Sequence, residues 1–229
     1  MASHWIPLNI ISHYRIINTK GGVTPTQIQN IYKPDYFING GQYARDSMQN
    51  ITYMMHGGTF DGHLFSDEML VLGTSDNPAY LDVIHKDTVR ASTTISNAIS
   101  GAPLLVYDGK PDIRWGNFFS ASIAGPSQDN MTLKAFRSLI GFNSDYLIMC
   151  STDKPVTIPD LASIAVNQFH LKYAFALDGG GSCHLQKSST PQITSYRANV
   201  SWILIYLDTG YAPVQPFCPT CGQPLPPKK

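Results

Sequence analysis

Three consecutive glycines, Gly179, Gly180 and Gly181, stand between Asp178 and Ser182 and form the pattern with the clearest chemical meaning in this sequence. Glycine loses more conformational freedom on folding than any other residue, so such a run needs a compensating use. Successive backbone N–H groups without side chains can surround an anion such as phosphate. We therefore predict an anion site here, with the Asp178 carboxylate beside it and the Ser182 hydroxyl as a further donor. The alternative is a tight turn with a solvated aspartate.

A second candidate site is the turn formed by Asn39, Gly40 and Gly41, which follows an apolar stretch at residues 36–38. Asn-Gly after a strand is most often a hairpin turn. In the functional interpretation, Asn39 presents its amide to a sugar hydroxyl or a phosphate oxygen, and Gly40 belongs to the same binding turn.

Three short apolar runs lead into glycine-containing turns, at residues 36–38, 103–107 and 173–177. They are partly aromatic or β-branched and are bounded by residues that tolerate a positive φ, which predicts strands. The second run ends at Asp108, a further carboxylate candidate. We expect the ends of all three strands to converge on one cleft.

Taken together, these segments resemble the phosphodiester glycosidase family. The resemblance rests on the Asn-Gly-Gly turn at residues 39–41, the Pro-Leu-Leu-Val-Tyr-Asp-Gly strand at 103–109 and the Leu-Asp-Gly-Gly-Gly-Ser turn at 177–182. Arg137, followed by Ile-Gly, and Arg197, before an apolar run, look like two arginines of the family. Order and spacing agree over about residues 30–207.

The resemblance implies a hydrolase that cleaves the bond between the anomeric carbon of a sugar and a phosphodiester. Arg137 and Arg197 would bind the phosphate, since a guanidinium pairs with two phosphate oxygens at once. A carboxylate would act at the oxocarbenium-like carbon, with Asp178 as first choice and Asp108 as second. The partner is then a sugar phosphate or a glycosyl phosphodiester. Retaining and inverting chemistry both stay open.

Two departures from the family pattern keep other functions open. Gln42 stands where the family prefers an aromatic residue, and residues 129–136 lack the histidine usual before Arg137. One alternative is a binder that sequesters a sugar phosphate or a nucleotide signal without turnover. Another is a phage-particle protein that recognises cell-wall phosphodiesters.

The turn chemistry and the family resemblance imply a single α+β domain around a mixed, strand-rich sheet with a few flanking helices. The 229 residues are 43% hydrophobic and 14% charged, which is enough apolar material for a core. Helical spacing of apolar residues predicts a helix over residues 158–170, capped by Thr157, and a weaker one over 26–32. The domain should span residues 1–211, followed by a proline-rich tail at 212–229.

The tail contains Cys218 and Cys221, spaced like two thiolate ligands of a zinc site. A closed structural site needs four ligands, which two copies of the tail could supply in a homo-oligomer. The alternative is a reduced thiol pair without a ligand. Catalysis itself should require no cofactor. Cys150 ends an apolar run and is expected to be a buried small hydrophobic residue.

Charge and hydropathy exclude several classes of partner. The formal net charge is zero and no long run of Lys or Arg occurs, which disfavours generic nucleic-acid binding. No apolar stretch approaches the roughly 18–20 residues of a membrane helix. The first residues lack the pattern of a secretory signal, so we expect a cytoplasmic protein, or a phage-encoded one that acts in the host or on a particle.

Overall fold

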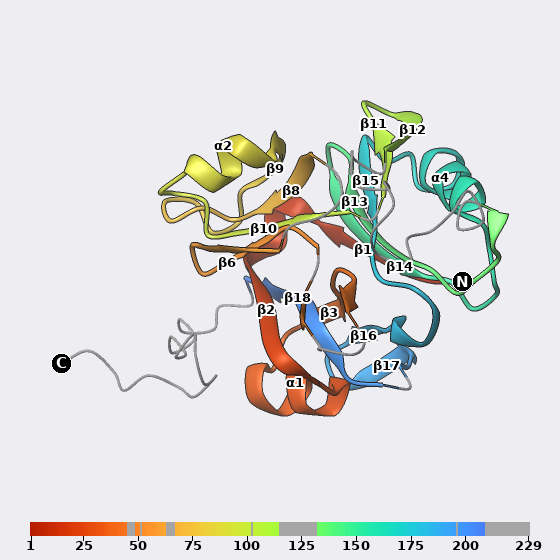
Figure 1. Cartoon of the computed structure of the whole chain (residues 1–229), viewed down its shortest axis with the longest axis horizontal. Helices are drawn as coiled ribbons and strands as arrows, with labels where there is room; N and C mark the ends of the chain where they lie inside the picture. The colour runs from red at the N-terminus through yellow and green to blue at the C-terminus, as the bar shows by residue number, and fades with distance from the viewer. Residues whose placement is uncertain are drawn as a thin grey trace.

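The computed structural model describes residues 1–44, 49–50, 52–62, 67–101, 103–114, 132–195 and 197–208. In this part the strands form one six-stranded sheet, two five-stranded sheets and a two-stranded ribbon, with few helices (Figure 1). The expected strand-rich α+β fold is confirmed. All described strand pairs are antiparallel rather than mixed, which changes where strand ends meet. The predicted tail lies outside the described residues.

The six-stranded sheet has apolar side chains on both faces. Within β14, Leu147 and Met149 face the central core, whereas Ile148 and Cys150 face a helix, as the two-residue period of a strand requires. Burial of Cys150 confirms the expectation for that residue. In spatial order the strands are β1 (Ala2–Pro7), β14 (Tyr146–Ser151), β13 (Ser138–Phe142), β15 (Tyr173–Ala176), β11 (Leu104–Tyr107) and β12 (Lys110–Arg114).

Helix α4 (Ile158–Asn167) covers the outer face of this sheet (Figure 1). Thr157 and Asp160 form the predicted capping box, and Leu161 and Ala165 are buried against the sheet. The helix ends before the predicted residue 170 because His170 has a left-handed φ of 51°.

A five-stranded sheet carries the other predicted helix. Its strands, in spatial order, are β17 (Thr190–Ile193), β16 (Leu185–Lys187), β3 (Tyr36–Asn39), β18 (Asn199–Leu207) and β2 (Ile11–Val23). Helix α1 (Pro25–Tyr32) packs on it through Ile28 and Tyr32, which contact the aromatic cluster around Phe37 and Trp202. A capping box between Thr24 and Gln27 begins this helix one residue earlier than predicted.

The second five-stranded sheet consists of β7 (Thr59–Asp61), β6 (Met54–His56), β10 (Asn97–Ser100), β8 (Glu68–Leu72) and β9 (Leu81–His85). Helix α2 (Lys86–Ala91) packs against it through the buried Val89. The ribbon pairs β4 (Tyr43–Ala44) with β5 (Gln49–Asn50), and a short 3-10 helix, η1 (Leu8–Ile10), joins β1 to β2.

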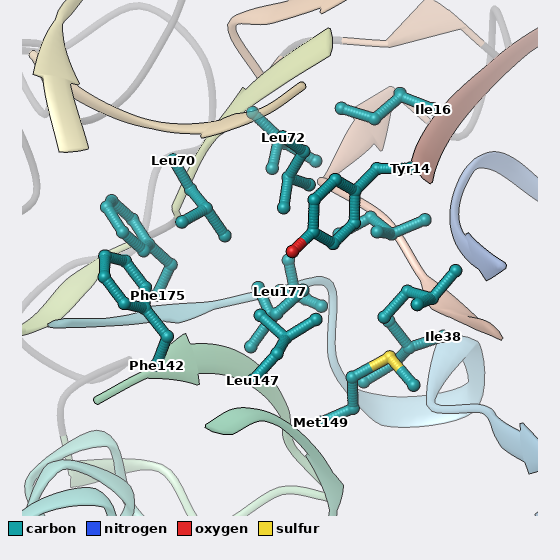
Figure 2. Close-up of a cluster of buried hydrophobic side chains, with 14 of the residues drawn as sticks. Tyr14, Ile16, Ile38, Leu70, Leu72, Phe142, Leu147, Met149, Phe175 and Leu177 are labelled. Atoms are coloured by element: carbon teal, nitrogen blue, oxygen red, sulfur yellow. The ribbon is translucent and has the colours of Figure 1, made fainter. Parts of the chain in front are cut away.

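One apolar core lies between the three large sheets. Figure 2 shows Tyr14 and Ile16 of β2, Ile38 of β3 and Leu70 and Leu72 of β8 directed toward the same interior. The six-stranded sheet closes it with Phe142, Leu147, Met149 and Phe175, and Leu177 joins them directly after β15. Because this core draws on distant parts of the sequence, the three sheets stabilise one another and fix the loops at their edges.

The buried side chain of Asn39 connects two of these sheets. Its amide nitrogen donates to the carbonyl of Asp178 at 2.8 Å and to that of Gly40 at 3.4 Å. Its amide oxygen accepts from Ser138 Oγ at 2.9 Å and from the backbone N–H of His184 at 3.0 Å. Asn39 is 0% exposed, so each of these bonds is made without competition from water.

His184 lies next to this connection, and its imidazole is enclosed. Nδ1 accepts from the N–H of Ser195 at 3.2 Å, so Nε2 carries the proton and donates to Gln186 Oε1 at 3.1 Å. The ring stacks on Phe37. Burial lowers the pKa of His184 to about 4, since the interior disfavours the charged form.

We predict that Asn39→Ala lowers the free energy of unfolding by roughly 1–3 kcal/mol or more, because it leaves the buried N–H of His184 without an acceptor. Urea unfolding followed by circular dichroism measures the effect. The control is Asn167→Ala at an exposed position of α4, which should change stability by no more than about 0.5 kcal/mol. Equal stability of the two variants would contradict a structural role for Asn39.

We also predict that stability falls in acid through His184. With a folded pKa of about 4, below the usual 6.5, the unfolded state binds the proton first. The contribution is therefore complete above about pH 6.5 and is lost toward pH 4, by up to about 1.4 kcal/mol per pH unit. Burial also lowers the pKa values of His4, His13 and His56, so the comparison must be between variants.

Urea unfolding at pH 7 and pH 5 of His184→Asn isolates this contribution. The variant should lose less stability between the two pH values than the wild type does. His170→Asn is the matched control, because His170 is exposed and asparagine tolerates its left-handed φ. If His184→Asn lost as much stability between pH 7 and pH 5 as the wild type does, protonation of the buried His184 imidazole would not be the cause of that loss.

Candidate functional site

The Asp178 turn and the Asn39 turn lie side by side. The N–H of Asp178 donates to the carbonyl of Gly40 at 3.0 Å, and the amide of Asn39 returns a bond to the carbonyl of Asp178. Strands β3 and β15 therefore end at the same place, although they belong to different sheets. The predicted convergence of these two strand ends is correct.

The carboxylate of Asp178 is held at the start of the glycine turn. Oδ1 accepts from the N–H of Gly179 at 3.0 Å, and the residue is partly exposed. Its charge acts on Arg137: burial lowers the pKa of that guanidinium, and the thiolate form of Cys183 and the charge of Asp178 oppose the shift. A partly exposed carboxylate thus lies beside a half-buried cation.

Arg137 borders the turn on the side of Gly179. A Cβ at Gly179 would lie 3.7 Å from Arg137 Nη1 and 2.9 Å from the carbonyl oxygen of Phe136. Nη2 donates to the carbonyl of Leu133 at 2.9 Å, and the backbone N–H donates to Thr152 Oγ1 at 2.9 Å. These bonds fix the guanidinium close to the bare backbone of the turn.

Arg197 borders the same turn on the side of Gly181. A Cβ there would lie 2.5 Å from Arg197 Nη2, so only glycine leaves room for this guanidinium. Ser195 Oγ holds the segment, because its single proton lies between the carbonyl oxygens of Gly181, at 3.0 Å from Oγ, and Arg197, at 2.7 Å. Within the described ranges, no hydrogen bond or ion pair engages the guanidinium itself. It is a positive charge without a counter-ion there.

The glycines do not form the open anion site that we expected. The N–H of Gly179 is bound by Asp178 Oδ1, and the N–H of Gly180 donates to the carbonyl of Phe136 at 2.8 Å. Only Gly181 keeps an N–H without an acceptor among the residues described. Gly180 has a φ of 61°, in the left-handed region that favours glycine. At Gly179 and Gly181, a side chain would collide with atoms of neighbouring segments. Gly179 leaves room for the carbonyl of Phe136, and Gly181 leaves room for the guanidinium of Arg197.

Three predicted ligand-binding residues prove to be structural. Asn39 is buried and uses its amide within the protein, so it cannot offer it to a sugar. Gly40 is packed against Ser201, where any side chain would clash. Ser182 is 1% exposed, and its N–H closes the turn on Gly179 at 3.2 Å, so its hydroxyl does not face a ligand at the surface.

The structure does not bring Asp108, the second carboxylate candidate, to the Asp178 turn. Strands β11 and β15 run antiparallel, so the end of β11 lies beside the start of β15 rather than its end. Asp108 sits in the β11–β12 hairpin with a φ of 48°, 3.9 Å from Lys172 Nζ, and its side chain is 71% exposed. A parallel pairing would have been needed to bring it to Asp178.

Sequence reasoning missed two residues of the site. Cys183 lies beneath the turn, with Sγ 4.0 Å from the carbonyl of Asp178, and burial raises the pKa of its thiol to about 12. The charges of Arg137 and Arg197 both act on that thiol, which indicates that they flank the same place. Ser195 was the other omission. Neither stands in a recognisable motif, so no sequence signal marked them.

A pocket with a volume of about 330 Å³ is lined in part by Arg197. It lies between the start of α1 and the β16–β17 hairpin. The residues that line it are Thr24, Pro25, Thr26, His184, Gln186, Pro191, Thr194, Ser195, Arg197 and Ala198.

The described residues contain no group of three or more His, Cys, Asp or Glu side chains that could hold a metal ion. The proposed zinc ligands Cys218 and Cys221 lie outside them. None of the described helices has the length and apolar character required to cross a membrane.

Solved structures with a similar fold were found, whereas no curated protein sequence matches significantly. The zebrafish N-acetylglucosamine-1-phosphodiester alpha-N-acetylglucosaminidase catalytic domain, auto-inhibited by its pro-peptide, has a TM-score of 0.65 and 13% identity over 87% of this chain and 73% of that chain. A hypothetical protein from Synechocystis has a TM-score of 0.60 and 13% identity over 90% of this chain and 58% of that chain. At these identities the likeness shows the fold alone.

The family comparison covers most of the sequence. Residues 32–205 match the family described as phosphodiester glycosidase, and this range includes the Asn39 turn, Arg137, the Asp178 turn and Arg197. These segments meet at one site in the structure. The chain therefore belongs to the phosphodiester glycosidase family.

Proposed function

We propose that this protein is a hydrolase that cleaves the glycosidic bond between the anomeric carbon of a sugar and a phosphodiester. The observation that carries the proposal is the placement of the Asp178 carboxylate on a glycine turn flanked by Arg137 and Arg197. Water is added across the bond: its hydroxyl goes to the anomeric carbon and its other proton to the phosphate oxygen.

The arginines would bind the phosphate group. A phosphodiester carries one negative charge, and the guanidinium of Arg197 has no counter-ion in the described part of the chain, so it is ready to accept one. Arg137 is held beside the turn by the carbonyl of Leu133 and would add positive charge next to the phosphate. The N–H of Gly181 can add one neutral donor.

Asp178 would act at the anomeric carbon. Phosphate is a good leaving group, so the principal demand is to stabilise the oxocarbenium-like transition state, and a carboxylate can serve as nucleophile, base or electrostatic partner. With Asp108 at the opposite end of the sheet, Asp178 carries this role without it. The proposal requires no metal ion or organic cofactor.

Asp178→Asn should abolish turnover while the fold and phosphate binding persist. Asparagine Oδ1 can still accept from the N–H of Gly179, whereas the negative charge is lost. We expect kcat to fall by roughly 100- to 10,000-fold with an unchanged Tm. The measurement is turnover of a panel of glycosyl phosphodiesters, with products identified by mass spectrometry. Asp108→Asn is the matched control and should retain full activity.

A wild type that binds these diesters but turns over none of them would instead support a sequestering protein. Full activity of Asp178→Asn with a lowered Tm would reduce this carboxylate to a structural role.

Arg197→Ala should weaken binding of a phosphate-bearing ligand by roughly 1.5–3 kcal/mol, the value of a charged hydrogen bond, which corresponds to about 10- to 150-fold in Kd. Stability should change little, because the guanidinium makes no hydrogen bond or ion pair within the described residues. Isothermal titration compares the Asp178→Asn variant with the double variant Asp178→Asn, Arg197→Ala. The Asp178 change prevents turnover, so the titration measures ligand affinity alone. Arg114→Ala, which removes ion pairs to Glu68 and Asp112 in another region, is the control. Equal affinities would remove Arg197 from the phosphate site.

A further inference from the structure

Strand β1 forms one edge of the six-stranded sheet, and one side of its backbone has no bonded strand within the described ranges. Directly after β1, the N–H of Leu8 donates to the carbonyl of Asp145 at 2.9 Å, in register with the pairing of β1 and β14. Hydrogen-bonded pairs alternate along an antiparallel ladder, so the even-numbered residues of β1 bond to β14. The backbone N–H and C=O groups of Ser3 and Trp5 therefore point toward the free side of the strand.

This edge lacks the residues that normally prevent strand addition. Proteins usually block an exposed edge with charged side chains or with proline. Strand β1 has no charged residue, apart from a histidine whose pKa is lowered by burial, and its proline stands at the end. Each other edge strand of the three large sheets contains a blocking residue: Arg15 in β2, Asp61 in β7, Asp82 in β9, Asp112 in β12 and Pro191 in β17. Among the edges described, β1 is thus the open one.

A rigid aromatic side chain stands beside the open edge. Trp5 is 44% exposed and lies on the face of the sheet that carries α4. Its ring meets those of Tyr146 and Phe169 edge to face, with centroids 5.8 Å and 5.7 Å away. Because these neighbours already hold the indole, burying its exposed surface costs little further side-chain entropy. Tryptophans held in this way are typical anchors of protein interfaces.

A second copy of the same strand matches the hydrogen-bonding groups of this edge. A two-fold axis perpendicular to the sheet pairs the strands antiparallel and keeps each face of the sheet on its own side. With His4 opposite His4 of the second copy, Ser3 lies opposite the other Trp5, and all of their outward N–H and C=O groups are bonded. The register with Trp5 opposite Trp5 instead requires Pro7, which has no N–H to donate.

We propose that β1 pairs with β1 of a second copy of this chain, so that two six-stranded sheets become one continuous sheet. The small side chain of Ser3 leaves space for the indole opposite, and the two Trp5 side chains become diagonal neighbours, roughly 7–8 Å apart. A two-fold contact places like residues near each other, and the absence of charge in β1 avoids repulsion there.

The C-terminal residues of the same chain are a poorer match for this edge. They follow Asp208, whose N–H donates to the carbonyl of Ile10 at 2.7 Å, close to the end of β1. However, six prolines at positions 213–227 remove N–H groups that an added strand needs. The second copy is therefore the occupant that the backbone chemistry favours.

Sedimentation equilibrium of the full-length protein tests the proposal. Cys218→Ser with Cys221→Ser is the background, because it removes the tail thiols as another route to a dimer. We expect the mass of two chains at concentrations up to about 100 µM. Ser3→Pro deletes an outward N–H without touching the bonds to β14, and it should raise the dimer Kd at least about tenfold. Ser3→Ala keeps the N–H and is the matched control, with an unchanged Kd.

A side-chain variant provides the second test, and the Tm of each variant reports whether it folds. Trp5→Lys removes the apolar anchor and brings two like charges close to the axis, so it should also yield the mass of one chain. Ile31→Lys on α1 is the control, since Ile31 is equally exposed at 44% and lies in another region. A wild type that stays monomeric throughout, or a dimer that persists in both Ser3→Pro and Trp5→Lys, would overturn the proposal.

Covalent capture tests the register. Residues opposite each other in a non-hydrogen-bonded antiparallel pair have Cα atoms about 4.5 Å apart, within the roughly 4.4–6.8 Å that a disulfide spans. In the same cysteine-free tail background, oxidised His4→Cys should run as a covalent dimer on a non-reducing gel. Asn167→Cys, at an exposed position of α4, should remain a single chain. Equal cross-linking of the two variants would contradict the proposed pairing.

Discussion

The buried amide of Asn39 joins the end of β3 to the Asp178 turn, to Ser138 at the start of β13 and to the backbone of His184. These segments come from two sheets. The most distant partner, His184, is 145 positions away from Asn39 in the sequence. A buried amide is stable only when its oxygen and nitrogen are both bonded, so all of these segments must hold their relative positions. The site geometry depends on this constraint, although Asn39 itself touches no ligand.

Glycine at the Asp178 turn solves a problem of space. Two guanidinium groups must approach the same short backbone segment, and a Cβ at Gly181 would meet one of them. The turn's own N–H groups at Gly179 and Gly180 are bonded within the protein, so the glycines contribute mainly by their lack of side chains. The positive charge of the site then comes from Arg137 and Arg197 rather than from the backbone.

Burial keeps two titratable side chains near these arginines uncharged. The thiol of Cys183, beneath the turn, has a pKa raised to about 12, and the imidazole of His184, behind the pocket, has one lowered to about 4. Near neutral pH the first carries no negative charge and the second no positive charge. Asp178 and the two arginines are thus the charged side chains identified at the turn, which suits a ligand with a single negative charge.

The sequence by itself determined the strands before Asn39 and Asp178, helix α4 with its capping box, most of helix α1, the family, and the two arginines of the site. It gave no indication of helix α2 or of the Thr24 cap of α1. The predicted features depend on local patterns: apolar periodicity, capping residues, and glycines that mark turns. Only the tertiary structure decided which residues meet. It placed Asp108 at the far end of the sheet because β11 and β15 pair antiparallel, and it buried Asn39 and Ser182 among other segments. It also brought Cys183, Ser195 and the Arg197 pocket to the turn, because strand direction and hydrogen bonds between distant segments leave no periodic trace in the sequence.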